Sequence, residues 1–152
     1  MKLSRQCRLA AVGPVFKDAA NGRVAPFIRI NHGESTLYDK PEFAGCVPAD
    51  VLISSGTLIS LAVIDRVGAM DESLFIDAVD TEWCLRACSE EYQSFGVMHA
   101  VLYHSLGDKT HTVWFGRRRH LPEHTPLRFY YIFRNSLLLY KRGYIPLRWK
   151  MK

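Results

Sequence analysis

The chain has 152 residues, of which 48% are hydrophobic and 23% are charged, so it is long enough for one globular domain and too short for two. No stretch approaches the roughly 18 consecutive apolar residues that span a bilayer, so we expect no transmembrane helix in it. The net charge of +5 is unevenly distributed: residues 117–152 hold ten Lys and Arg against one acidic residue, whereas residues 1–116 hold ten against fourteen. This asymmetry predicts different partners for the two parts.

The four cysteines predict neither a disulfide framework nor a zinc cluster. Cys7, Cys46, Cys84 and Cys88 form no C-x-x-C pair, and no secretory leader is recognisable before them. Cys84 and Cys88 lie four residues apart and are interpreted as buried small hydrophobic residues. This cysteine usage fits a reducing cytoplasm.

The first 50 residues have few regular signals. The stretch LAAVGPVF over 9–16 is typical of a short strand, and NGR over 21–23 is a hairpin turn signal. Neither GxGxxG nor GxxxxGK[ST] occurs in the chain, so no phosphate-binding loop of those types is expected.

Residues 51–68 form a nearly continuous apolar run that is interrupted by Ser-Ser-Gly at 54–56. This pattern predicts a buried strand, a tight turn and a second short element that ends at Gly68. Such runs belong in the middle of an α/β sheet.

Three acidic residues, Asp77, Asp80 and Glu82, crowd into six positions just before an amphipathic segment. A helix that begins near Asp80 or Thr81 would explain one or two of them, because carboxylates in the first turn stabilise a helix by roughly 0.3 to 1 kcal/mol. The apolar side of this helix comprises Trp83, Cys84, Ala87 and Cys88, and Arg86 has the spacing for an ion pair with Glu82. The pattern leaves two interpretations open, a capped surface helix and a functional carboxylate cluster. A carboxylate at a helix start can also accept a proton from an incoming hydroxyl.

The sequence predicts two more elements after this helix, a strand and a long C-terminal helix. The stretch 92–104 is β-like and ends at His104, before a polar loop. A helix is predicted from Thr125, as N-cap before Pro126, to a stop at Gly143. Its apolar stripe is expected to pack inward, and Arg128 and Arg134 are expected to face water, lipid head groups or a phosphate. The stripe consists of Phe129, Ile132, Phe133, Leu137 and Tyr140.

Several of these motifs occur together in one known family. The Ser-Gly turn, Asp-Glu before Phe-Ile-Asp, Asp-x-Glu-Trp-Cys-x-Arg, the histidine and Arg-x-Tyr-Tyr-x-x-Arg-Asn resemble, in order and spacing, the C-terminal half of glycosyltransferase family 2. Within that family the chain is most similar to bacterial rhamnosyltransferases, over about residues 9–145. The resemblance implies an α/β fold, a partial GT-A fold with a mixed sheet, flanking helices and a C-terminal amphipathic helix. Residues 1–116 would be part of the catalytic domain and residues 117–152 a basic, aromatic helical arm.

The resemblance also implies an inverting transfer of a deoxy sugar from dTDP-rhamnose to a lipid-linked saccharide acceptor, in O-antigen or other cell-surface polysaccharide synthesis. Asp80 falls on the family's base, with Asp77 and Glu82 as acceptor-binding or charge-tuning neighbours. His104 falls on a ligand of a divalent metal, Mg²⁺ or Mn²⁺. Substrate binding would involve Ser55, Gly56, Trp83 and Arg86.

The chain departs from the family where the family binds its donor, since no first-strand motif and no Asp-x-Asp pair precede the similarity. We therefore expect it to be inactive alone and to need a separate N-terminal half, with a homodimer as another way to cover its open sheet edge. The alternative is a truncated remnant, or a non-catalytic module that contacts a membrane or a protein. Arg117–Arg119 would also suit nucleic acid, but the apolar stripe favours an anionic membrane surface, and hence a peripheral position at the cytoplasmic face of the bacterial plasma membrane.

Overall fold

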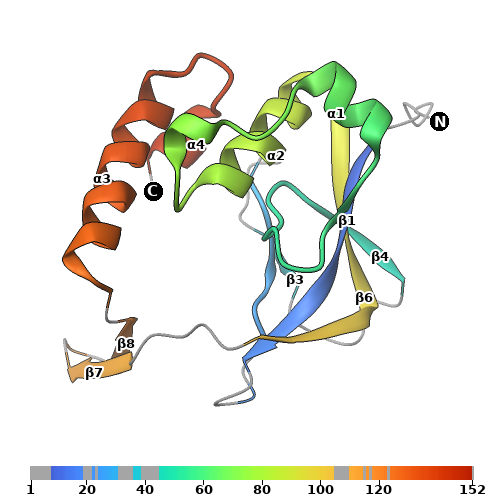
Figure 1. Cartoon of the computed structure of the whole chain (residues 1–152). Helices are drawn as coiled ribbons and strands as arrows, with labels where there is room; N and C mark the ends of the chain where they lie inside the picture. The colour runs from blue at the N-terminus through green and yellow to red at the C-terminus, as the bar shows by residue number, and fades with distance from the viewer. Residues whose placement is uncertain are drawn as a thin grey trace.

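Two long strands, β1 (Arg8–Asp18) and β6 (Tyr92–His104), form the centre of a mixed sheet in the computed structural model (Figure 1). They run parallel, and β4 (Cys46–Ala49) and β5 (Leu58–Ile59) pair antiparallel with them at the edges, in the order β4-β6-β1-β5. The structure describes residues 8–18, 22, 24–30, 36–38, 45–104, 110–114, 116, 118–122 and 124–151. The predicted strand over 92–104 is confirmed, and so is the presence of a strand over 9–16, but this strand does not end at Gly13-Pro14 as predicted and continues to Asp18.

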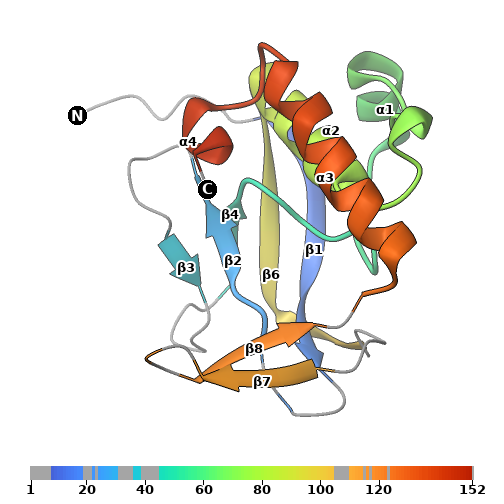
Figure 2. The same ribbon diagram turned by 90° about the vertical axis from the view of Figure 1, so that its left-hand side faces the viewer.

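Helices cover this sheet in two successive layers. The helix α2 (Val79–Ser89) packs on β6 and β1, and α3 (Pro126–Lys141) packs on α2, as Figures 1 and 2 show. The α/β architecture with a mixed sheet and flanking helices is thus confirmed. The remaining elements are α1 (Leu61–Val67), the 3₁₀ helix η1 (Glu72–Leu74), α4 (Leu147–Lys150), and the strand pairs β2 (Phe27–Arg29) with β3 (Thr36–Tyr38) and β7 (Thr110–Trp114) with β8 (Arg118–Pro122).

Two clusters of buried side chains hold the layers together. The larger lies between the sheet and α1 and α2, and includes Ala11, Val15, Val63 and Trp83. The smaller joins η1, α2 and the C-terminal helices through Leu74, Leu85, Leu139 and Ile145. Burying each of these large apolar side chains contributes about 1.5 to 3 kcal/mol, so α3 is anchored to the rest of the fold by its own core.

In the apolar run over 51–68, the predicted tight turn and the end of the second element at Gly68 are confirmed, but the predicted central strand is not. Residues 51–53 form only an isolated bridge between Val51 and Ile28, β5 is an edge strand rather than a central one, and residues 61–67 are helical. Val63 and Val67 recur at the helical spacing and are both buried. Within the run Leu52, Val63 and Val67 are buried, whereas Leu58 and Leu61 are exposed, a mixture that hydrophobicity cannot distinguish from a buried strand.

The helix α3 has the predicted ends but presents the opposite face to the core. The Thr125 side chain accepts a hydrogen bond from the Arg128 N–H at 3.3 Å and caps the helix as predicted. The prediction that its apolar stripe packs inward is wrong, because Phe133 and Leu137 are 68% and 67% exposed while Asn135 is fully buried. Where Arg128 and Asn135 lie, the surface beneath α3 presents backbone carbonyls and the Asp77 carboxylate, which polar side chains satisfy and apolar ones do not, whereas Leu139 packs in the smaller apolar cluster.

Three further observations concern the predictions on membranes, cysteines and turns. In the described part of the chain, no helix combines the length and apolarity needed to cross a bilayer. Cys46, Cys84 and Cys88 are free thiols. Cys7, most of the turn at 21–23, Arg117 and the side chains of Arg118 and Arg119 lie outside what the structure describes.

Candidate functional site

Asp80 lies in the first turn of α2 and faces a pocket of about 200 Å³. Among the residues that the structure describes, Asp80 is the only carboxylate that lines the pocket, and the other lining residues are mainly apolar. The pocket is lined by Leu52, Ile53, Ser54, Thr57, Ile59, Met70, Asp80, Trp83 and Cys84. The volume suits a single sugar ring better than a disaccharide.

Two backbone N–H groups orient the Asp80 carboxylate. The Ser54 N–H donates to Oδ2 at 3.1 Å and the Thr81 N–H donates to Oδ1 at 2.8 Å. Each oxygen retains a further lone pair, because a carboxylate accepts about four hydrogen bonds in total. The carboxylate is therefore held in place and still able to accept a proton from a hydroxyl in the pocket.

The turn over residues 54–57 brings the Ser54 N–H group to Asp80. The Thr57 N–H donates to the Ser54 carbonyl at 3.2 Å, and Gly56 has φ +73°. A Cβ on Gly56 would also lie 3.0 Å from Pro14 Cγ, so both the backbone angle and the close approach of β1 require glycine.

Two residues of this turn, Ser54 and Thr57, line the pocket. The predicted residues Ser55 and Gly56 do not line it. Ser55 and Gly56 shape the turn instead. Ser54 was not predicted from the sequence because it contributes a backbone N–H, which every residue except proline carries. The Ser-Ser-Gly interruption of an apolar run was the available signal.

Trp83 is a core residue with little surface to offer a ligand. Its side chain is 1% exposed, and its Nε1 donates a hydrogen bond to the Gly68 carbonyl at 2.8 Å. Trp83 is among the residues that line the pocket, but its burial fits the other interpretation of this residue, a tryptophan of the core, and a role in substrate binding stays a prediction. Next to it, burial raises the pKa of the Cys84 thiol to about 11, so Cys84 is a neutral wall residue.

The segment before Asp80 has a strained backbone. Phe75 has φ 60° and ψ −66°, and the Ile76 N–H donates to the Leu74 carbonyl at 2.7 Å, which defines a γ-turn of the rarer, strained type. Asp77 and Ala78 both have φ 63°. Each such non-glycine residue costs on the order of 1 to 3 kcal/mol and persists only where surrounding contacts enforce it.

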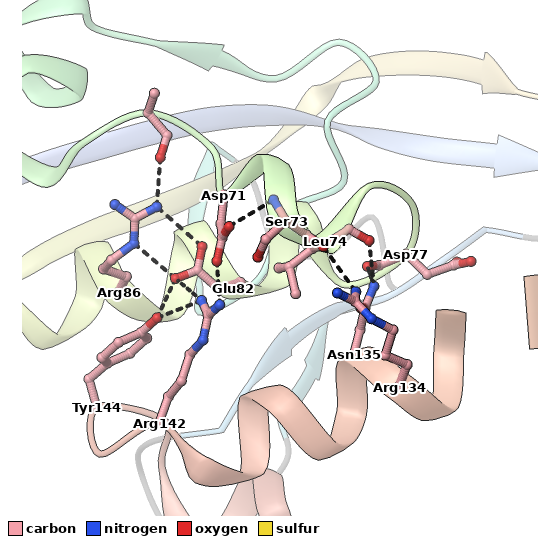
Figure 3. A network of polar contacts seen from close by, with 11 residues as sticks. Asp71, Ser73, Leu74, Asp77, Glu82, Arg86, Arg134, Asn135, Arg142 and Tyr144 are labelled. Carbon is pink, nitrogen blue, oxygen red and sulfur yellow. Dashed lines mark hydrogen bonds and ion pairs between the residues drawn. The ribbon is translucent and has the colours of Figure 1, made fainter. Parts of the chain in front are cut away.

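Glu82 lies in a buried ion-pair network on the other side of α2 from the pocket (Figure 3). Its side chain is fully buried, and its carboxylate accepts hydrogen bonds from Arg86 and Tyr144 and forms an ion pair with Arg142 at 2.9 Å. Burial, followed by the contact with Glu82, raises the pKa of Tyr144. These three donors occupy the carboxylate within the protein, and the role of Glu82 as an acceptor-binding or charge-tuning neighbour of Asp80 stays a prediction.

Arg86 is also occupied within the protein. Its guanidinium donates to Glu82 at 2.9 Å and to the carbonyls of Val67 and Ala69, which ties the end of α1 to α2. It does not line the pocket of Asp80. In this structure Arg86 joins two helices, and its role in substrate binding stays a prediction.

Asp77 pairs with the C-terminal helix rather than with the pocket. Arg128 donates from Nε to Asp77 Oδ2 at 3.1 Å and from Nη2 to Oδ1 at 3.2 Å, a bidentate ion pair. The three crowded carboxylates therefore point to three different places, and among them Asp80 faces the pocket.

The described residues do not form a metal site. Within them, no three His, Cys, Asp or Glu side chains lie close enough together to hold an ion, and the residues present do not fit a divalent cation on their own. His104 ends β6 as predicted, but its side chain lies outside what the structure describes.

Comparison with known proteins relates the chain to glycosyltransferases. It is 38% identical over 138 residues to the dTDP-rhamnosyl transferase RfbF of Shigella flexneri, a match that covers 89% of this chain and 45% of that protein. The chain thus spans less than half the length of this relative. No family model and no solved structure matches the chain.

Proposed function

We propose that this chain forms the acceptor side of a sugar-transfer site of the GT-A type, with Asp80 as the general base. The observation that carries the proposal is the Asp80 carboxylate, oriented by Ser54 and Thr81 at a pocket of monosaccharide size. The similarity to a dTDP-rhamnosyl transferase supports the reaction class and suggests dTDP-rhamnose as donor.

In this reaction an acceptor hydroxyl in the pocket gives its proton to Asp80 while its oxygen attacks the anomeric carbon of the donor sugar. The bond between that carbon and the diphosphate oxygen breaks, dTDP leaves with the electron pair, and the anomeric configuration inverts. The apolar walls, including Leu52 and Ile59, exclude water that would compete with the acceptor.

Acceptor binding is tested on the chain itself by NMR. Titration with a panel of methyl glycosides, including methyl α-L-rhamnoside, should shift the Ser54, Thr57 and Thr81 amides saturably, and Asp80→Asn should weaken the best binding at least tenfold. Asp65→Asn is the matched control, because Asp65 is an exposed aspartate on the neighbouring helix α1. Shifts that are absent for every glycoside, or unchanged in Asp80→Asn, would reject the acceptor site.

Donor binding is proposed to need more than these 152 residues, because the chain covers 45% of its relative and its described residues gather no metal ligands. A divalent cation held in part by His104 belongs to this proposal. Calorimetry with dTDP-rhamnose and Mn²⁺ should then show no binding to the folded chain. Metal-dependent binding that His104→Ala abolishes would show instead that the chain binds its donor unaided.

The exposed stripe of α3 supports a second element of the proposal, contact with an anionic membrane that carries a lipid-linked acceptor. Phe129, Phe133 and Leu137 are exposed, and residues 124–151 contain six Lys and Arg and no acidic residue. Binding to vesicles with anionic lipid should fall with salt and at least tenfold in Phe133→Glu, with Glu90→Gln as a control away from the stripe. Equal binding to neutral vesicles would count against it.

A further inference from the structure

Asn135 makes an unusual set of contacts from the middle of α3. Its side chain is fully buried, and its amide nitrogen donates to three carbonyls. Those of Leu74, at 2.8 Å, and Asp77, at 2.9 Å, can be seen in Figure 3, and the third is that of Ile76, at 2.8 Å. Two hydrogens serve three acceptors, so at least one is shared. An amide is among the few neutral side chains with two donors on one atom.

A neighbouring arginine sets the orientation of this amide. Arg134 Nη1 donates to Asn135 Oδ1 at 2.9 Å and to the Ser73 carbonyl at 2.9 Å. The oxygen of Asn135 is thereby directed toward Arg134 and its nitrogen toward the loop. Together the two residues bind four of the carbonyls between residues 73 and 77.

The bound carbonyls belong to the strained segment that leads into α2. Phe75, Asp77 and Ala78 have positive φ angles, and Ala78 is the N-cap of the helix whose first turn carries Asp80. The direction in which α2 begins depends on these angles. A relaxed segment would let the first turn rotate or unwind and move Asp80 away from the Ser54 N–H.

We propose that Asn135 is a positioning residue for Asp80: it holds residues 74–77 in the conformation that aims the Asp80 carboxylate into the pocket. The proposal rests on the proposed function for its catalytic meaning, while its structural content concerns the Asp80 position only. The C-terminal helix then acts as a clamp on the site without touching the pocket.

The test uses the Ser54 amide as a reporter, since it donates to Asp80. Asn135→Ala should raise hydrogen exchange of the Ser54 and Ile76 amides by about 10- to 100-fold relative to the sheet amides, and shift the Ser54 resonance. Asn135→Asp, which keeps the shape and removes the donors, should do the same.

Leu139→Ala is the matched control, because Leu139 is equally buried one turn further along α3 and packs on Leu74 and Leu85 without bonding the loop. It should lower global stability and leave the Ser54 amide unchanged relative to the sheet. An unchanged Ser54 amide in folded Asn135→Ala, or an equal change in Leu139→Ala, would overturn the proposal.

This outcome is independent of any sugar, so it is distinguishable from a failure of the proposed function. In a preparation that transfers sugar, Asn135→Ala should lower kcat at least tenfold with KM for the donor unchanged, whereas Leu139→Ala should leave both unchanged. Loss of activity through a rise in KM alone would contradict a positioning role.

Discussion

The buried carboxylate of Glu82 allows a quantitative prediction, because its partners and their exposure are known. Glu82→Gln keeps the size of the side chain and removes its charge. Arg86 and Arg142 then lose their common counter-charge in a site where their side chains are only 19% and 22% exposed. Removing one partner of a buried ion pair typically costs 3 to 5 kcal/mol.

Two features place this variant at the lower end of that range. Arg142 keeps its ion pair with Asp71, and Arg86 keeps its hydrogen bonds to the carbonyls of Val67 and Ala69. We therefore expect a loss of about 3 kcal/mol in the free energy of unfolding, seen in urea as a lower midpoint with an unchanged slope.

Glu90→Gln is the control, since Glu90 is an exposed residue at the end of the same helix and should change stability by less than about 0.5 kcal/mol. A double-mutant cycle with Tyr144→Phe should give a coupling energy of about 1 kcal/mol, because the Tyr144 hydroxyl contacts Glu82 directly. A loss below about 1 kcal/mol in Glu82→Gln would refute the assignment of Glu82 to a stabilising network.

Three further predictions concern stability. Gly96→Ala should destabilise by about 1 to 3 kcal/mol in chemical denaturation, since its Cβ would lie 2.3 Å from the Phe27 ring, and Phe27→Leu should restore part of the loss. Glu91→Gly should stabilise the protein by about 0.5 to 1 kcal/mol because Glu91 has φ 66°, whereas Glu90→Gly should destabilise it. A higher melting temperature for Glu90→Gly than for Glu91→Gly would contradict this. Hydrogen bonds from Ser73 and Arg142 lower the pKa of Asp71 from 3.8 to about 2, so the contribution of Asp71 to folding stability is fully present above about pH 5 and is lost as the pH falls through 2. Asp71→Asn should therefore flatten the acid side of the curve of stability against pH. An unchanged acid side would exclude Asp71 as its origin.

Local signals in the sequence were sufficient for several elements. The N-cap at Thr125, the start of α2 near Asp80 and the pair of Glu82 with Arg86 each depend on residues within four positions of one another. Such features follow from backbone geometry and side-chain spacing alone. The same holds for the strands β1 and β6, whose sequences are apolar and bounded by polar residues.

The face of α3 was mispredicted because its partner surface is formed by a distant segment. Asn135 bonds to carbonyls 58 to 61 residues earlier in the chain. Hydrophobic periodicity assumes that the surface beneath a helix is apolar. Where part of that surface is a strained loop with exposed carbonyls, the buried side of the helix includes a polar residue, and the Asn135 within a largely apolar helix is the signal that was available.

Ion pairs within the molecule account for part of the charge asymmetry of the sequence. The acidic and basic parts were expected to face different partners, yet three carboxylates between residues 71 and 82 pair with arginines between residues 128 and 142. The contacts are Asp71 with Arg142, Asp77 with Arg128, and Glu82 with Arg142. Part of the opposite charge of the two regions is thus neutralised inside the molecule.

This internal pairing explains why carboxylates crowd around Asp80. The proposed base, Asp80, lies at the start of α2 and must be aimed, and this helix start is reached through a strained segment that cannot hold its own shape. Asp77 and Glu82 flank Asp80 on both sides and fasten it to the C-terminal helices through Arg128 and Arg142. The flanking acids are therefore required by the position of Asp80 rather than by the chemistry in its pocket, and their loss should move Asp80 before it changes anything else in the site.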